Sequence, residues 1–65
     1  MVTFTVTRIA MDTTVIDSKE IDIDPANFNR LDPRQITERM PDGSPKTVQI
    51  WDCLNKWTSV YTRNN

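Results

Sequence analysis

The chain has 65 residues, no histidine, a single cysteine and a formal net charge of −1 at neutral pH. One cysteine excludes a disulfide framework within the chain, and without histidine it cannot supply the four Cys or His ligands of a structural zinc site. The acidic balance argues against duplex DNA, which is bound through a basic patch or stripe. A chain of this length predicts a single domain over residues 1–65, with a small core that a partner subunit can complete.

Two further features bear on location. No apolar run reaches the roughly 18–20 residues that a membrane-spanning helix needs, so no membrane contact is expected. The opening segment, MVTFTVTRIAMD, lacks a basic region followed by an apolar stretch and does not read as a signal peptide. Together with the unpaired Cys53, which is typical of a reducing compartment, these features predict a cytoplasmic protein.

The first half of the chain predicts a β-hairpin. Residues 2–9, VTFTVTRI, alternate apolar and polar side chains and favour a strand. Residues 10–17, AMDTTVID, have no clean period and are interpreted as the loop. Residues 18–24, SKEIDID, alternate again and predict a second strand. This second strand has an apolar face with Ile21 and Ile23 and an acidic face with Glu20, Asp22 and Asp24.

The middle of the chain repeats one pattern, in which Asp precedes Pro. Asp24 and Asp32 fit the helix N-cap position, with proline at the first helical position. We therefore expect two short helical pieces, over residues 25–31 and 33–40, with a break or bend at Asp32 because a residue before proline avoids helical angles. The apolar side of this segment would consist of Phe28, Leu31, Ile36 and Met40.

The second half predicts another hairpin. Residues 40–45, MPDGSP, form a turn on any interpretation. Strands are expected over residues 46–52 and 56–62, joined by residues 53–55. The predicted fold class is therefore α+β (ββαββ): a mostly antiparallel sheet of about four strands, with a short helical segment between the two hairpins that covers one face.

The register of the second hairpin decides where the aromatic side chains lie. A three-residue loop that ends on a left-handed Asn55 pairs Asp52 with Lys56 and places Trp51 opposite Trp57. The alternative is a two-residue turn that requires a positive φ at Lys56. We prefer the first, which puts Trp51, Trp57 and Tyr61 on one face and Val48, Ile50 and Val60 on the other.

Either face of this hairpin could be the buried one. In one hypothesis the aromatic face is the core, because each large ring buries roughly 150–250 Å² that a small domain needs. In the other, the aliphatic face is buried and Trp51, Trp57 and Tyr61 form an exposed platform. Tryptophan and tyrosine dominate interface hot spots, and they also stack on unpaired bases.

The remaining candidate sites have plainer interpretations. The acidic strand favours a solvated face over a metal site, because calcium takes oxygens from a tightly turned loop; a stripe that competes for a basic groove on a partner is the alternative. Cys53 has no histidine to activate it, so no catalytic residue, cofactor or enzymatic activity is expected. Arg30, Arg34 and Arg39 are expected on a solvated face, or against an acidic partner or RNA phosphates.

The strand-strand-helix-strand-strand layout of this small acidic chain resembles small phage-encoded inhibitor proteins. That resemblance implies binding to a host enzyme or defence complex through a sheet face or edge. The leading hypothesis is a non-catalytic protein-binding module, an inhibitor or accessory factor. The alternatives are a single-stranded nucleic-acid binder and a self-associating subunit, for instance a homodimer through Val48, Ile50 and Val60. The expected partner-binding residues are Trp51, Trp57, Tyr61, Glu20, Asp22 and Asp24.

Overall fold

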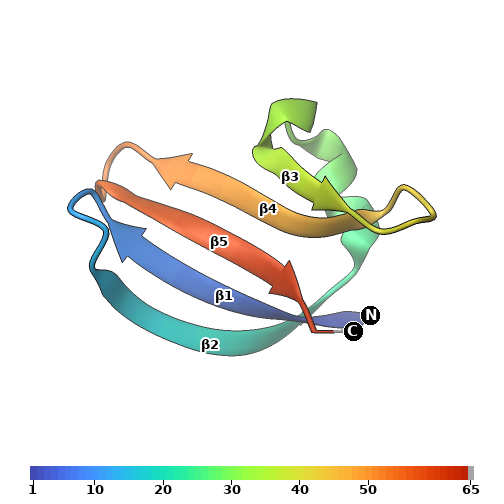
Figure 1. Cartoon of the computed structure of the whole chain (residues 1–65), viewed down its shortest axis with the longest axis horizontal. Helices are drawn as coiled ribbons and strands as arrows, with labels where there is room; N and C mark the ends of the chain where they lie inside the picture. Colours follow the sequence, from blue (N-terminus) through green and yellow to red (C-terminus); the bar gives the residue numbers. More distant parts are fainter. Residues whose placement is uncertain (65) are drawn as a thin grey trace.

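The computed structural model describes residues 1–64 and arranges them around one five-stranded sheet. In chain order the strands are β1 (Val2–Ala10), β2 (Val15–Ile23), β3 (Ile36–Arg39), β4 (Pro45–Asp52) and β5 (Trp57–Arg63). They lie in the order β2-β1-β5-β4-β3, and every neighbouring pair is antiparallel. The strands from the two ends of the sequence, β1 and β5, therefore lie side by side at the centre of the sheet (Figure 1).

The β1–β2 hairpin confirms the alternation that the sequence predicted. Phe4 pairs with Ile21 and Val2 with Ile23, so the apolar side chains of both strands share one face. Arg8 pairs with Asp17 but Ile9 pairs with Val15, which leaves one extra residue between them as a β-bulge.

The predicted α+β class is wrong, because the middle of the chain contains no α-helix. Pro25–Arg30 and Pro33–Gln35 are short 3-10 helices, η1 and η2, and residues 36–39 form the edge strand β3 instead of continuing a helix. The Asp-Pro signals were correct, since Asp24 accepts a hydrogen bond from the Ala26 amide and Asp32 from the Arg34 amide. The turn at residues 40–44 brings β3 alongside β4, where pairing satisfies backbone groups that a short helix would leave open.

The core lies between the sheet and η1. Phe28 of η1 packs edge-to-face on Phe4 and on Tyr61, with ring centroids 5.4 Å and 5.5 Å apart. Phe4 and Val48 are fully buried beneath it. We call this side of the sheet the inner face; partly buried apolar side chains around the core are Val2, Ile23, Leu31, Ile36 and Ile50.

The helical turns cover only part of the sheet. Figure 1 shows them near the end that carries both termini, whereas the β1–β2 and β4–β5 turns lie at the opposite end. We call that opposite end the hairpin end. The other side of the sheet, the outer face, carries Thr5, Ile9, Trp51 and Val60 among its side chains.

The β4–β5 turn corrects the preferred register. Asp52 pairs with Trp57, and Trp51 pairs with Thr58, so the connecting loop has four residues. The Asp52 carboxylate accepts hydrogen bonds from the amides of Leu54 (3.0 Å) and Asn55 (3.1 Å), and this local capping stabilises the longer loop. A shift of one residue moves every following side chain to the other face, so the two tryptophans lie on opposite faces of the sheet.

Lys56 closes this loop with a φ of 61°, in the left-handed region that costs a side-chain-bearing residue roughly 1–2 kcal/mol. Replacing Lys56 by glycine should therefore stabilise the protein, by about 0.5–1 kcal/mol once the larger entropy of the unfolded glycine chain is included. Urea unfolding measures the change. Lys56→Ala is the matched control, because it removes the charge but keeps Cβ; equal stability of the two variants would contradict the strain at this position.

Hydrogen bonds hold the pKa of several aspartates below its usual range, chiefly through side-chain donors on nearby residues. The aspartate and donor pairs are Asp12 with Thr14, Asp17 with Arg8, Asp32 with Arg34, Asp42 with Ser44, and Asp52 with Asn55. Because each folded pKa lies below the unfolded value of about 3.9, the stabilisation is complete above about pH 4 and is lost as the pH falls through the folded values. Thermal unfolding should show a Tm that is level near neutral pH and falls below about pH 4. A Tm that stays level into strong acid would contradict this.

Candidate partner-binding face

The register of the strands places the outer-face side chains in cross-strand rows, because directly paired residues point to the same side. The row nearest the hairpin end is apolar, and the polar and acidic rows follow it along the strands. In that order the rows are Val15, Ile9, Thr58 and Trp51; then Ser18, Thr7, Val60 and Gln49; then Glu20, Thr5, Thr62, Thr47 and Glu38; and last Asp22 and Thr3. The outer face thus changes from apolar to acidic along its length.

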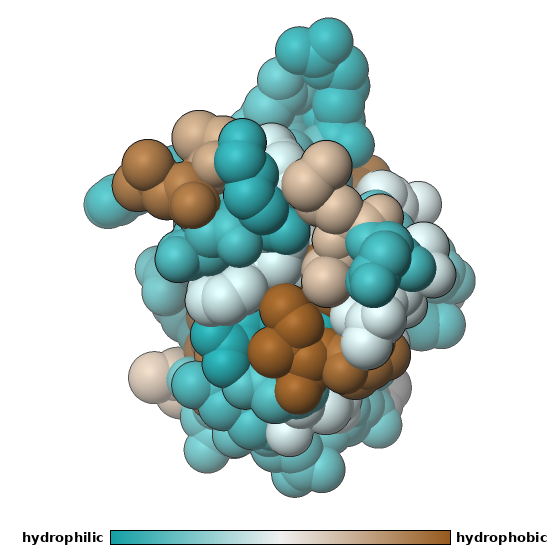
Figure 2. Space-filling view, turned by 90° about the vertical axis from the view of Figure 1, so that its left-hand side faces the viewer, coloured by the Kyte–Doolittle hydropathy of each residue, from teal (hydrophilic) through white to brown (hydrophobic). Residues whose placement is uncertain are grey.

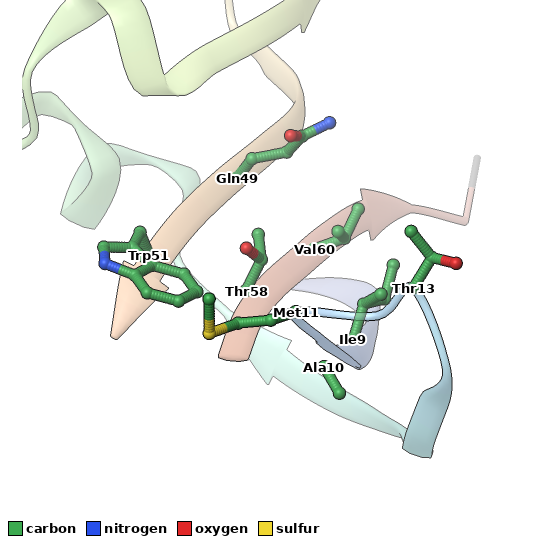
Figure 3. A pocket seen from close by; sticks show the side chains of 8 residues that line it. All are labelled: Ile9, Ala10, Met11, Thr13, Gln49, Trp51, Thr58 and Val60. Atoms are coloured by element: carbon green, nitrogen blue, oxygen red, sulfur yellow. The ribbon is translucent and has the colours of Figure 1, made fainter. Parts of the chain in front are cut away.

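An open groove of about 440 Å³ lies at the apolar end of this face. We call it the Trp51 groove; its lining residues are Ile9, Ala10, Met11, Thr13, Gln49, Trp51, Thr58 and Val60. Figure 3 shows Met11 extending from the β1–β2 turn toward the Trp51 ring, while Val60 and Ile9 lie on the far side. Trp51 is 46% exposed and Met11 is 71% exposed, so both are accessible to a ligand.

Exposed large apolar side chains concentrate at the hairpin end. Besides Met1, those of residues 1–64 are Met11, Val15, Ile16, Trp51 and Leu54. All five lie in or beside the β1–β2 and β4–β5 turns. Figure 2 looks at this end and shows apolar surface in separate areas among hydrophilic atoms. Exposed apolar surface rimmed by polar residues is typical of an interaction site.

The β1–β2 turn that forms one wall of the groove is held in an uncommon backbone conformation. Thr13 has a φ of 72°, which is rare for a β-branched residue. The turn is closed by hydrogen bonds from the Thr13 amide to the Ala10 carbonyl (2.9 Å) and from the Ala10 amide to the Thr14 carbonyl (2.8 Å). Backbone strain of this kind clusters at binding sites, which makes the groove wall a functional candidate.

The charges on the outer face are acidic. Glu20 is exposed, and Asp22 accepts a hydrogen bond from the Thr3 hydroxyl at 2.7 Å. Glu38 lies 3.4 Å from the Lys46 ammonium, so its charge is partly compensated. Within residues 1–64, the four rows contain no Lys or Arg. The face therefore presents a negative field beside an apolar groove.

The structure separates the predicted binding residues into three groups. Trp51, Glu20 and Asp22 share the outer face, whereas Trp57 and Tyr61 lie on the inner face. The sixth residue, Asp24, caps η1. The hypothesis of one aromatic face is therefore wrong, both as a core and as a platform.

Trp57 has a structural contact of its own on the inner face. The Arg8 guanidinium lies over its ring at 4.5 Å from the centroid, which is cation–π geometry. Arg8 also donates to Asp17, with Nε 2.7 Å from Oδ1, so the ring, the cation and the carboxylate form one stack. This stack extends the inner face toward the hairpin end, where η1 does not reach.

The aliphatic patch expected for self-association is divided as well. Val48 and Ile50 lie with the core on the inner face, whereas Val60 lines the Trp51 groove on the outer face. Sequence reasoning also missed Ile9 and Met11 as groove residues, because the segment AMDTTVID has no clean period. The apolar Met11, directly before the turn residues Asp12 and Thr13, was the available signal in the sequence.

The separation of the tryptophans predicts different fluorescence for two single-tryptophan variants. Trp57→Phe retains the exposed Trp51 and should emit further to the red, with strong acrylamide quenching. Trp51→Phe retains Trp57, which the Arg8 guanidinium covers, and should be quenched less. Equal quenching constants in two variants with the same Tm would contradict the assignment of the rings to opposite faces.

Comparison with known proteins does not assign this chain to a family. A scan against protein-family models, a search of the curated proteins and a search of the solved structures found no match. Within residues 1–64 no helix is long and apolar enough to cross a membrane. The same part of the chain has no group of three or more His, Cys, Asp or Glu side chains placed to hold a metal ion.

Proposed function

We propose that this chain is a non-catalytic protein-binding module of the cytoplasm, and that it holds its partner on the outer face with Trp51 as the anchor. One observation carries the proposal: a half-exposed tryptophan lines an apolar groove at the end of an otherwise polar sheet face. Tryptophan is enriched among the residues that dominate binding energy, and such anchors sit in apolar pockets surrounded by a polar rim. An inhibitor or accessory subunit of a larger complex is the class that fits such a module.

The acidic rows favour a protein over a single-stranded nucleic acid. Base stacking on an aromatic platform is accompanied by a positively charged groove that follows the phosphate backbone. The outer face has one exposed tryptophan, Trp51. Within residues 1–64, the charged side chains in its rows are Glu20, Asp22 and Glu38, all of them acidic. Phosphates along this face would meet like charge.

Site-specific photo-cross-linking tests this proposal. A photoreactive residue at Gln49, which lines the groove, should form an adduct with a defined protein in extracts of the source cells. The same residue at Lys19 is the matched control, since that position is also exposed but lies on the other face of the sheet. Excess unlabelled wild-type protein should suppress the Gln49 adduct, and excess Trp51→Ala should not.

Three outcomes would contradict the proposal. Identical adducts from both positions would mean that the outer face is not selective. Suppression of the Gln49 adduct by excess Trp51→Ala would show that Trp51 is not the anchor. Adducts with nucleic acid alone would support the nucleic-acid-binding function instead. Circular dichroism of each labelled protein verifies that it is folded.

A further inference from the structure

The partner can be specified further from the charge pattern of the outer face. The apolar row that contains Ile9 and the row that contains Thr5 and Glu20 are four residues apart along β1, or about 13 Å in an extended strand. A partner that runs along β1 from the Ile9 side of the Trp51 groove therefore passes beside Glu20 and Asp22, which belong to the neighbouring strand β2. Complementary charge there sets partner choice and association rate.

Within residues 1–64, Lys46 forms the one ion pair with an acid of the outer-face rows, and its partner is Glu38. Arg8 is engaged by Asp17 on the inner face, and Lys19 extends from the inner side of β2. Arg34 bonds to Asp32 beside η2. Glu20 and Asp22 form no ion pair within residues 1–64, so they are accessible to cations of a partner.

Building on the proposed function, we propose that the occupant of the outer face is a basic polypeptide segment. It places one aliphatic or aromatic side chain in the Trp51 groove and Lys or Arg residues over Glu20 and Asp22. In extended form, about four residues separate the anchor from the cations. The cations of the segment pair with the acidic rows, and its apolar side chain fits the shape of the groove.

A second copy of this chain is a poorer occupant. Two outer faces stacked with their strands in the same direction place the β2 edge of one copy over the β3 edge of the other, so that Glu20 of each copy lies over the edge that carries Glu38. Juxtaposing like charges across an interface is unfavourable and suppresses the wrong partner. The acidic rows thus select against the same chain as well as against nucleic acid.

Selection from a library of random peptides of about 12 residues, more than enough to span about 13 Å, tests this inference. Selected peptides are titrated by fluorescence polarisation against wild type, Trp51→Ala and the double variant Glu20→Gln/Asp22→Asn. The binders that Trp51→Ala abolishes should be basic, with an aliphatic or aromatic residue about four positions from Lys or Arg. The double variant should weaken them about three- to tenfold at low salt, and high salt should remove that difference.

Lys19→Gln is the control for net charge. It makes the protein more acidic from the other face of the same strand. It should leave the affinities unchanged, whereas an effect of overall charge would strengthen binding.

The outcomes separate the two proposals. Trp51-dependent peptides that are neutral or acidic, or that ignore the double variant, overturn the basic segment and leave the protein-binding function standing. The absence of any Trp51-dependent peptide overturns both. Asp22→Asn keeps an oxygen for the Thr3 hydroxyl, so loss of binding by the double variant with an unchanged Tm cannot be assigned to unfolding.

Discussion

Phe28→Ala should destabilise the protein by about 3–5 kcal/mol, the usual cost of removing a buried ring. Phe28 is 5% exposed and contacts both Phe4 and Tyr61, so its loss leaves a cavity and detaches η1 from the inner face. A domain of 65 residues has a total stability of about 3–10 kcal/mol. The Tm should therefore fall by about 15–30 °C, and much of the protein can be unfolded at room temperature.

Thermal and urea unfolding followed by circular dichroism measure this effect. Leu54→Ala is the matched control, because this side chain is 89% exposed and its truncation should change stability by no more than about 0.5 kcal/mol. A Phe28→Ala protein as stable as the control would mean that η1 does not close the core. The inner face would then be as open as the outer face.

Trp51→Ala should do the opposite: it should leave the fold intact and remove binding. The ring is half exposed and lies outside the core, so we expect less than about 1 kcal/mol of lost stability. As an anchor in an apolar groove it should contribute at least about 2 kcal/mol to affinity, which is a rise in Kd of about 30-fold or more.

Titration of a purified outer-face binder, such as a peptide from the selection above, measures this change. Leu54→Ala is again the control, since it removes an apolar side chain at the same end of the molecule without altering the groove lining. Equal losses of affinity in the two variants would show that apolar surface in general, and not the Trp51 groove, retains the partner. A large fall in Tm for Trp51→Ala would show that the ring supports the fold instead.

Local patterns in the sequence predicted the parts of this fold that depend on neighbouring residues. The alternation VTFTVT defines β1 and its faces, and the Asp-Pro pairs define where η1 and η2 begin. β3 was missed because Asp32 and Pro33 give a helix N-terminal signal and Ile36 and Met40 are four residues apart, as on one side of a helix. Pairing with β4 depends instead on residues distant in sequence. Strand formation here is a tertiary effect that overrides the local preference.

The candidate site depended on a smaller detail. Trp51 was selected as a candidate binding residue on chemical grounds, and the structure places it half exposed in the groove. Trp57 and Tyr61 lie on the other face, because one residue of loop length decides which ring faces outward. That length is fixed by the carboxylate of Asp52 capping Leu54 and Asn55, a side-chain interaction that hairpin statistics do not include. Glu20 and Asp22 join Trp51 only once the order of the strands is known.

The pairing of β1 with β5 has a consequence for the chain during its synthesis. One wall of the Trp51 groove comes from residues 9–13 and the other from residues 49–60, and the two meet only across that central pair. Contacts between such distant segments form late, since the intervening chain must first be ordered. A nascent chain still lacking β5 has no groove, so it cannot capture a partner there until β5 has been synthesised and paired with β1. A partner that binds the groove would therefore stabilise the chain with the complete sheet relative to partly unfolded forms, because only the complete sheet has the groove.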